Sequence, residues 1–272
     1  MEMQTIIMIA ILLIFAGAVV GILAGLFGVG GGAVSVPVLY ETFGFMGLEE
    51  GVAMPLAVGT SLAIIIPTSL RSAWGHYQRG AVDTKLLRIW VLPIILGVLA
   101  GTSVASFADP WVFQLVFVAV ASVIAIKLFV GGKGWRVGEE LPSDWLLRIY
   151  GLIVGALSAL MGIGGGAISN LILTLHGKAI HQAIATSAGV GVLISIPGTI
   201  GYIIAGWGKS GLPVDALGYV SLLGFVLLVP TSFLTARTGV YLAHAMSRRA
   251  LEIAFGLFLL AVAARFLFAL ST

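Results

Sequence analysis

The octapeptide Gly28-Val29-Gly30-Gly31-Gly32-Ala33-Val34-Ser35 decides the fold, because a close copy follows 134 residues later as Gly162-Ile163-Gly164-Gly165-Gly166-Ala167-Ile168-Ser169. Each copy interrupts a long apolar run, and three adjacent glycines form helix poorly. Non-helical backbone inside a bilayer is tolerated only where protein or a water-filled cavity surrounds it. The doubled motif therefore predicts two broken helices buried within a membrane protein.

The composition agrees with a membrane location. Of the 272 residues, 60% are hydrophobic and 9% are charged, whereas a soluble domain carries about 25% charged residues. Open strands would leave backbone groups unpaired in lipid, so the apolar runs are expected to be helices. The apolar runs occupy 4–27, 33–45, 53–70, 88–107, 111–130, 145–161, 167–175, 183–206, 216–236 and 250–270. Most approach the roughly 20 residues that span a bilayer, but 33–45 and 167–175, which each follow a glycine cluster, are too short.

The two halves of the chain repeat. A second match pairs Ala57-Val58-Gly59-Thr60-Ser61 with Ala183-Ile184-Ala185-Thr186-Ser187, and a weaker one pairs 101–103 with 230–232. We predict a first transmembrane repeat over 1–130, a cytoplasmic linker over 131–144 and a second transmembrane repeat over 145–272. The predicted fold class is an all-α integral membrane protein of about 8–10 membrane segments, with five in each repeat.

The charge distribution predicts how the repeats are oriented. If each glycine cluster is the tip of a helical hairpin that returns to its own side, each half crosses the membrane an odd number of times and the repeats are inverted. If each cluster only breaks a continuous helix, three of the arginines move to the outside. The positive-inside rule favours the hairpins, because they place 12 of the 14 basic residues in cytoplasmic loops: Arg71, Arg79, Lys85, Arg88, Lys127, Lys133, Arg136, Arg148, Lys178, Arg237, Arg248 and Arg249. The acidic residues Glu41, Glu49 and Glu50 then face outside.

The glycine clusters are candidate anion sites. A helix that restarts at Ala33 or Ala167 presents unpaired N–H groups at the positive end of its dipole. Close helix packing is the alternative, and we prefer it for Gly17, Gly21 and Gly25. The candidate substrate-binding residues are Gly30, Gly31, Gly32, Ala33, Ser35, Thr60, Ser61, Gly164, Gly165, Gly166, Ala167, Ser169, Asn170, Thr186 and Ser187.

Other functional classes receive little support. The sequence has no nucleophile elbow and no H-E-x-x-H helix, so we do not expect an enzyme. It has no cysteine, and His176 and His181 beside Lys178 lack convergent partners, so we expect neither a metal nor a cofactor. Basic residues in short loops orient a membrane protein and do not indicate nucleic acid. No acidic residue lies clearly in mid-membrane, so a carboxylate proton relay is not visible.

The motif over 25–32, followed by Pro37, together with its second copy over 157–169 and the Ala-Thr-Ser step at 185–187, resembles the sulfite exporter TauE/SafE family. The resemblance covers about 10–270, nearly the whole chain. Two positions depart from the family pattern: Gly59 stands where alanine is commoner, and Leu171 stands where the second copy would match Pro37.

This resemblance implies a multi-pass protein of the bacterial inner membrane that exports small anions, such as sulfite or sulfoacetate, by a secondary mechanism. We expect alternating access around the two glycine clusters. An anion channel, or a transporter of another small carboxylate, sulfonate or ion, is the alternative. The expected partners are the anionic substrate and the lipid bilayer; a homodimer is left open.

Overall fold

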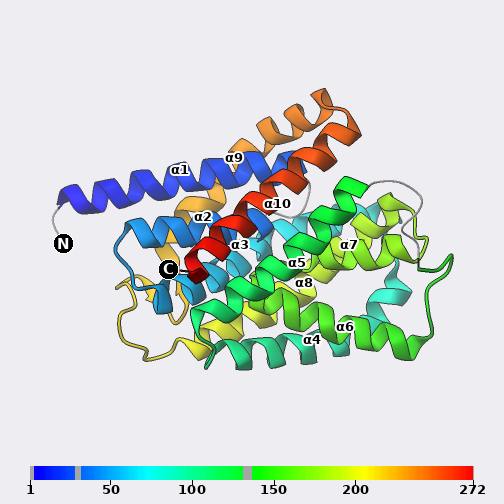
Figure 1. Cartoon of the computed structure of the whole chain (residues 1–272), viewed down its shortest axis with the longest axis horizontal. Coiled ribbons are helices and arrows are strands. Elements are labelled where there is room, and N and C mark those ends of the chain that lie inside the picture. The colour runs from blue at the N-terminus through cyan, green and yellow to red at the C-terminus, as the bar shows by residue number, and fades with distance from the viewer. Residues whose placement is uncertain (1–2, 28–31, 131–136, 272) are drawn as a thin grey trace.

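The structure is a computed structural model that describes residues 3–27, 32–130 and 137–271. The described residues form ten helices and one short β-hairpin, joined by connections (Figure 1). The helices are α1 (Met3–Phe27), α2 (Gly32–Phe45), α3 (Glu50–Gln78), α4 (Thr84–Ala105), α5 (Pro110–Val130), α6 (Asp144–Met161), α7 (Gly166–Leu175), α8 (Ile180–Ala205), α9 (Leu222–Ala245) and α10 (Arg248–Ser271). The hairpin pairs β1 (Ala216–Leu217) with β2 (Val220–Ser221). The ten predicted apolar runs appear as ten helices in the predicted order, which confirms the all-α fold class.

One predicted run begins too early. The run 216–236 was expected to be helical throughout, but 216–221 form the β-hairpin and α9 continues to Ala245. Gly218 enables the turn, because it takes a φ of +56° at the position where two-residue hairpins favour glycine. An apolar run by itself does not show whether its first residues form a β-hairpin or the first turn of a membrane helix.

Seven of the described helices, α3, α4, α5, α6, α8, α9 and α10, are long and apolar enough to cross a membrane. By contrast, α2 has 14 residues and α7 has 10. At 1.5 Å per residue they reach about 21 Å and 15 Å, short of the ~30 Å hydrocarbon core. The chain is thus a multi-pass membrane protein in which each short helix follows a glycine cluster.

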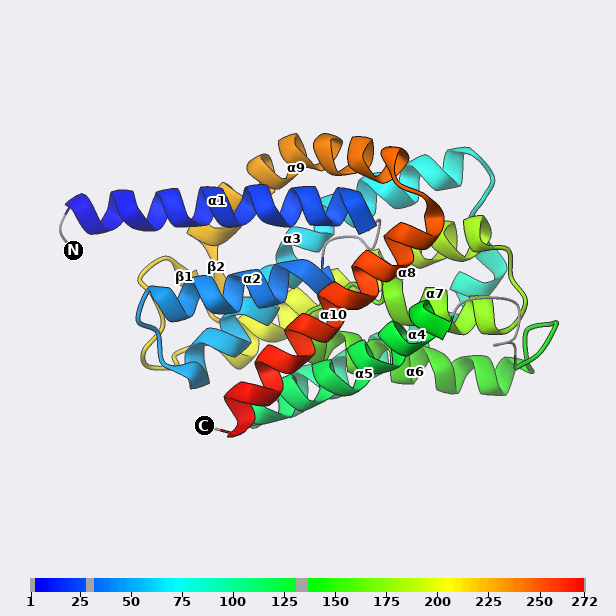
Figure 2. The same ribbon diagram turned by 45° about the horizontal axis from the view of Figure 1, so that its top comes forward.

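The connections gather at two ends of the molecule. We call the end with 46–49, 206–221 and the last turns of α10 the hairpin end, and the end with 79–83, 137–143 and 176–179 the linker end (Figures 1 and 2). Val137 N–H donates to the Leu175 carbonyl (2.9 Å) at the linker end. From the centre, α2 runs toward the hairpin end and α7 toward the linker end (Figure 2).

Helix packing places α3 in the interior, with α8 packed against it. In the apolar window of α3, 72% of residues are buried, against 22% in that of α9. Helix α1 packs on α9 and α6 packs on α4, so each half covers a helix of the other. Gly17 and Gly21 permit the close contact of α1 with α9, since a Cβ on Gly17 would overlap Thr231 and one on Gly21 would overlap Thr235. This supports the packing interpretation for these two glycines.

Candidate functional site

The two glycine motifs meet in the interior. A Cβ added to Gly32 would lie 2.9 Å from Ile163 Cα and 3.1 Å from the Gly162 carbonyl oxygen. Gly162 itself adopts a left-handed φ of +65°, and a Cβ there would lie 3.0 Å from Val58 Cα. Such an approach of backbone to backbone leaves no room for a side chain. We call this region, which holds 32–35 and 162–169, the junction.

A chain of hydroxyls crosses the junction from the first half. Ser35 Oγ lies 2.5 Å from Ser61 Oγ, and Ser61 Oγ donates to the Gly162 carbonyl at 2.8 Å. Both serines are at most 1% exposed. Because Ser61 uses its one hydrogen on Gly162, Ser35 is the donor between the two serines. The predicted residues Ser35 and Ser61 therefore tie α2 and α3 to the second motif.

The second half holds the equivalent pair. Ser169 Oγ lies 2.8 Å from Ser187 Oγ and 2.6 Å from the Gly165 carbonyl oxygen. Two polar atoms nearby, Ser158 Oγ and Asn170 Oδ1, are buried without a hydrogen-bond partner in the described residues. The Ser158 hydroxyl would lie 3.2 Å from a Cβ on Gly165. Unpaired buried polar atoms are rare in proteins and mark this side of the junction as a place with free hydrogen-bonding capacity.

The two predicted threonines are also buried, but their hydroxyls hold connections of the opposite half. Thr60 Oγ1 accepts the Ser221 N–H at 2.9 Å, and Thr186 Oγ1 accepts the Asp83 N–H at 3.0 Å. Ser221 belongs to β2 at the hairpin end, and Asp83 belongs to the connection 79–83 at the linker end. We call these two hydrogen bonds the threonine latches. In each Thr-Ser pair, the threonine holds a connection while the serine holds a short helix.

The remaining predicted residues lie beside these groups. Ala33 and Gly164 are buried, whereas Gly166 and Ala167 are half-buried at the start of α7. Gly32 and Ser61 contact the second motif directly, and Ser35 reaches it through Ser61. Ser187 on α8 is hydrogen-bonded to Ser169 of that motif. Gly30 and Gly31 lie outside the described residues.

An ion pair reinforces the latch at the linker end. Lys178 Nζ lies 2.9 Å from Asp83 Oδ2, with the two side chains 27% and 16% exposed. Burial on its own would raise the pKa of Asp83, but hydrogen bonds from Lys178 and the Leu86 N–H and the charge of Lys178 together lower that pKa below its ordinary value. The pair joins the α3–α4 connection to the α7–α8 connection.

This lowered pKa predicts an acid-dependent loss of stability. A carboxyl group with a depressed folded-state pKa stabilises the fold above its unfolded pKa, about 3.9, and that contribution is lost as pH falls through the folded-state value. Asp83→Asn keeps an N-cap side chain for α4 but removes the charge. At neutral pH we expect the variant to be less stable by about 1 kcal/mol, with the difference shrinking as pH falls through the lowered folded-state pKa of Asp83.

Thermal unfolding of the detergent-purified protein at several pH values measures this effect. Asp109→Asn, at an exposed position, is the control and should follow the wild type at every pH. A constant difference between wild type and Asp83→Asn from pH 7 to pH 3 would contradict the ion-pair explanation.

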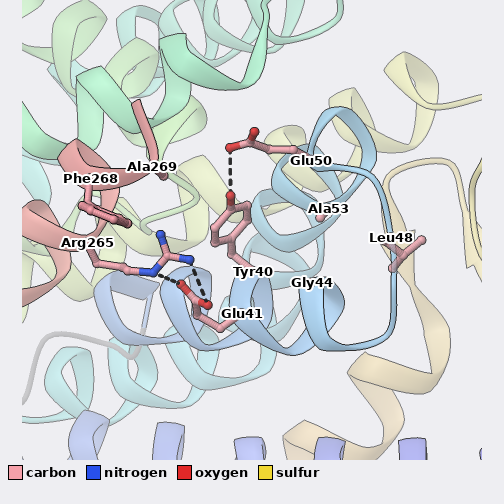
Figure 3. Close-up of a pocket in the computed structure, with 9 residues that line it drawn as sticks. All are labelled: Tyr40, Glu41, Gly44, Leu48, Glu50, Ala53, Arg265, Phe268 and Ala269. Atoms are coloured by element: carbon pink, nitrogen blue, oxygen red, sulfur yellow. Dashed lines mark hydrogen bonds and ion pairs between the residues drawn. The ribbon is translucent and has the colours of Figure 1, made fainter. Parts of the chain in front are cut away.

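A pocket at the hairpin end was missed by the sequence reasoning. Its volume is about 610 Å³, and its lining residues come from α2, α3, α10 and the α2–α3 connection (Figure 3): Tyr40, Glu41, Gly44, Leu48, Glu50, Ala53, Arg265, Phe268 and Ala269. Glu41 lies within α2 and not in a loop. Arg265 on α10 has its Nε 3.0 Å from Glu41 Oε1.

One sequence signal pointed to this pocket. Gln114 is a polar residue in the apolar run of α5, and polar residues inside membrane helices are commonly functional. Its side chain is 1% exposed and donates from Nε2 to Glu50 Oε1 at 2.6 Å. The partner, Glu50, was assigned to an outer loop, so the pairing was not visible in the sequence.

Comparison with known proteins agrees with this architecture. The family model described as Sulfite exporter TauE/SafE matches residues 13–266. A probable membrane transporter protein of Haemophilus influenzae is 33% identical over 253 residues, covering 93% of this chain and 96% of the relative. One of Methanocaldococcus jannaschii is 30% identical over 244 residues, covering 89% of each chain. Another of Bacillus subtilis is 27% identical over 217 residues, covering 72% of this chain and 79% of the relative.

No solved structure matches the chain. The family model spans most of the sequence, including both glycine motifs and both Thr-Ser pairs. Its coverage and the two relatives at or above 30% identity show that this chain belongs to the sulfite exporter TauE/SafE family of membrane transporters.

Proposed function

We propose that the protein exports small anions, with sulfite and small sulfonates such as sulfoacetate as substrates, by alternating access at the junction. The observation that carries the proposal is the contact of Gly32 with Ile163, which joins the two interrupted hairpins inside the protein. The family description names sulfite export, and the relatives' names state membrane transport. The junction is the place where both repeats contribute to one buried polar site.

The chemistry at the junction suits an anion. The first N–H groups of α2 and α7 have no intrahelical acceptor, and the helix dipole makes these ends positive. Ser158 and Asn170 add side-chain capacity that no protein group uses in the described residues. The Asn170 amide presents donors if it rotates by half a turn, since its oxygen and nitrogen occupy equivalent positions. A sulfite or sulfonate group accepts hydrogen bonds from all of these donors.

The threonine latches supply the two gates of the cycle. Thr60 in the first half holds Ser221 at the hairpin end, and Thr186 in the second half holds Asp83 at the linker end. Both latches are closed, and the junction serines are buried, which corresponds to an occluded state. Opening one latch at a time would expose the junction to one side of the membrane and then to the other.

The reciprocal contacts support two moving units. Helices α1 and α9 pair across the halves in the same way as α6 and α4. This is the pattern that two inverted repeats would produce, with 1–130 and 145–272 as the units and 131–144 as the link between them. The linker end carries most of the basic loop residues, so we place it in the cytoplasm of a bacterial cell, with the inner membrane around the helices.

Export of a monovalent anion can be driven by the membrane potential alone, without a carboxylate proton relay inside the membrane. An inside-negative membrane potential drives each negative charge outward by about 2.3 kcal/mol per 100 mV. Any coupled proton would add to this driving force. The membrane potential is therefore the first variable to control in a transport measurement.

The test is release from liposomes. Purified protein in liposomes loaded with labelled sulfite or sulfoacetate should release the label, and release should accelerate when a potassium gradient with valinomycin makes the lumen negative. Equal release from liposomes with and without protein would sink the proposal. Discrete unitary currents in planar bilayers would instead identify a channel.

A further inference from the structure

We propose that Lys127 captures the exported anion at the linker end and passes it along α7 to the junction. The inference rests on the proposed function, because it assigns the entry side of that same cycle. It arises from a cation near the end of a membrane helix that the transport proposal has not used.

Lys127 lies near the C-terminal end of α5, where this helix passes α7 (Figure 2). Its Nζ donates to Thr174 Oγ1 at 2.5 Å and to the Leu171 carbonyl oxygen at 3.5 Å. The Thr174 hydroxyl directs its own hydrogen at the Asn170 and Leu171 carbonyls of α7, at 2.7 Å and 3.1 Å, so it accepts from the ammonium group. The lysine side chain is half-buried, and both of its partners are neutral.

The positive charge of Lys127 is not neutralised. In the part of the chain that the structure describes, no carboxylate forms an ion pair with its Nζ. The ammonium group has three N–H bonds, so one remains available beyond the two in use. Ionisable residues within membrane helices are unfavourable and commonly mark the path of an ion or substrate. Lys127 therefore offers both a charge and a donor to an anion.

The two ends of the molecule differ at this kind of position. At the linker end, the last helix of the first half, α5, places Lys127 against α7; at the hairpin end, the last helix of the second half, α10, places Arg265 against α2. Arg265 Nε lies 3.0 Å from Glu41 Oε1, whereas α7 presents only the neutral Thr174 to Lys127. An anion thus meets a free cation at the linker end and a neutralised one at the hairpin end. This difference favours capture from the proposed cytoplasmic side.

Asn170 lies between Lys127 and the junction. Gly166, Asn170 and Thr174 follow one another at four-residue spacing, which places them on one side of α7. At 1.5 Å per residue, Thr174 is about 12 Å from the start of α7, and Asn170 is halfway along this route. Asn170 Oδ1 is buried without a hydrogen-bond partner in the described residues. An anion can therefore move from the ammonium group to the amide and then to the N-terminus of α7 in steps of about 6 Å.

The ammonium group also changes the electric field at the entrance. Helix α7 ends toward the linker end, so its last carbonyls carry the negative end of the helix dipole and would repel an approaching anion. Lys127 donates to one of the α7 carbonyls, at Leu171, and supplies the opposite charge. Such capping would by itself stabilise α7 without binding substrate, so a measurement has to separate the two roles.

Lys127→Met removes the charge and keeps an unbranched apolar side chain. Lys85→Met is its matched control, because Lys85 is exposed at the same end of the molecule, and Lys127→Arg keeps the charge. Inside-out vesicles turn the proposed cytoplasmic face to the medium. Uptake of labelled sulfite and of labelled sulfoacetate at varied concentration, with potassium and valinomycin holding the potential at zero, then measures capture at the linker end. The unfolding temperature of each purified variant reports on capping.

A cysteine variant restores the charge by chemical modification. The chain has no cysteine, so 2-bromoethylamine finds a thiol only in Lys127→Cys. The thiolate displaces bromide and forms a thioether that ends in an ammonium group, which resembles lysine. Iodoacetamide attaches a neutral group to the same sulfur. Both products derive from one folded variant, so their comparison does not depend on how well methionine is tolerated.

In Lys127→Met we expect the KM for uptake to rise at least tenfold, with the maximal rate within twofold of the wild type. Lys127→Arg and Lys85→Met should keep the KM within threefold of the wild type. Treatment of Lys127→Cys with 2-bromoethylamine should lower its KM at least fivefold, and treatment with iodoacetamide should not.

Three results would overturn the inference alone: a wild-type KM in Lys127→Met, an equal rise of the KM in Lys85→Met, or a KM of Lys127→Cys that 2-bromoethylamine leaves unchanged. A lower maximal rate at unchanged KM, together with a lower unfolding temperature, would show that Lys127 only caps α7 and would overturn it too. Absence of uptake of both anions by the wild type would overturn the proposed function as well.

Discussion

Thr60→Val should open the junction toward the hairpin end, and Thr186→Val should open it toward the linker end. Valine matches threonine in shape but cannot accept the Ser221 or Asp83 N–H. An unpaired buried N–H is unfavourable by about 1–3 kcal/mol, which changes a conformational equilibrium by roughly 5–150-fold. Each variant therefore weakens one latch and leaves the other intact.

The absence of cysteine from the chain makes this shift measurable. A single cysteine at Ala33, which is 2% exposed at the junction, reports access by a membrane-impermeant maleimide. We expect labelling of Ala33→Cys to rise at least fivefold from the hairpin end in Thr60→Val and from the linker end in Thr186→Val. Right-side-out and inside-out vesicles separate the two faces.

Two other threonines serve as controls for the loss of a hydroxyl. Thr68 on α3 and Thr199 on α8 donate only to carbonyls of their own helices in the described structure. Thr68→Val and Thr199→Val should leave labelling unchanged. Increased labelling from the same face in both latch variants would contradict the assignment of the latches to opposite gates.

Gly32→Ala should reduce transport at least tenfold. Its methyl group would lie 2.9 Å from Ile163 Cα and 3.1 Å from the Gly162 carbonyl oxygen, so the two motifs must separate to admit it. Overpacking of this kind costs about 1–3 kcal/mol, and a backbone neighbour cannot relieve it by changing rotamer. The expected lesion is at the junction, where the anion site is proposed.

Two alanine variants calibrate this result. Gly164→Ala meets Ile65 Cγ2 at 2.9 Å, which a side-chain adjustment can relieve, and a Cβ on Gly75 meets nothing within 4 Å. We expect a small loss of sulfite release for Gly164→Ala and none for Gly75→Ala. Release by Gly32→Ala at the wild-type rate, with an unchanged unfolding temperature, would show that close contact at the junction is not required for transport.

Much of the fold was predictable from short stretches of sequence. The apolar runs, their lengths and the two glycine interruptions follow from what a bilayer tolerates, and these are properties of segments of about 10–25 residues. The interpretation of Gly17 and Gly21 as packing residues also came from local spacing. The prediction of a helix over 216–221 was wrong, because these residues are as apolar as the end of a membrane helix and nevertheless form a β-hairpin.

The contacts of the candidate site residues could not be predicted from the sequence. The motif residues Ser35, Ser61 and Ser169 were chosen from their positions in the repeats, yet the partner of Ser61 is a carbonyl 101 residues away. Thr60 and Thr186 were predicted to bind substrate, whereas in the structure their hydroxyls accept hydrogen bonds from connections of the opposite half. No local pattern encodes which distant backbone group a buried hydroxyl will meet.

The sequence by itself determined that this chain lies in a membrane, that its helices are arranged in two related halves, and that each half is broken once by glycine. These features depend on the length and spacing of the apolar runs and on the poor helix-forming tendency of glycine, which are local properties of segments a few helical turns long. Only the tertiary structure decided that Gly32 meets Ile163, that each threonine latches the other half, and that Glu50 lies between Tyr40 and Gln114. These contacts join segments far apart in the chain, and they exist because burial in a packed interior selects the one arrangement that pairs the polar groups.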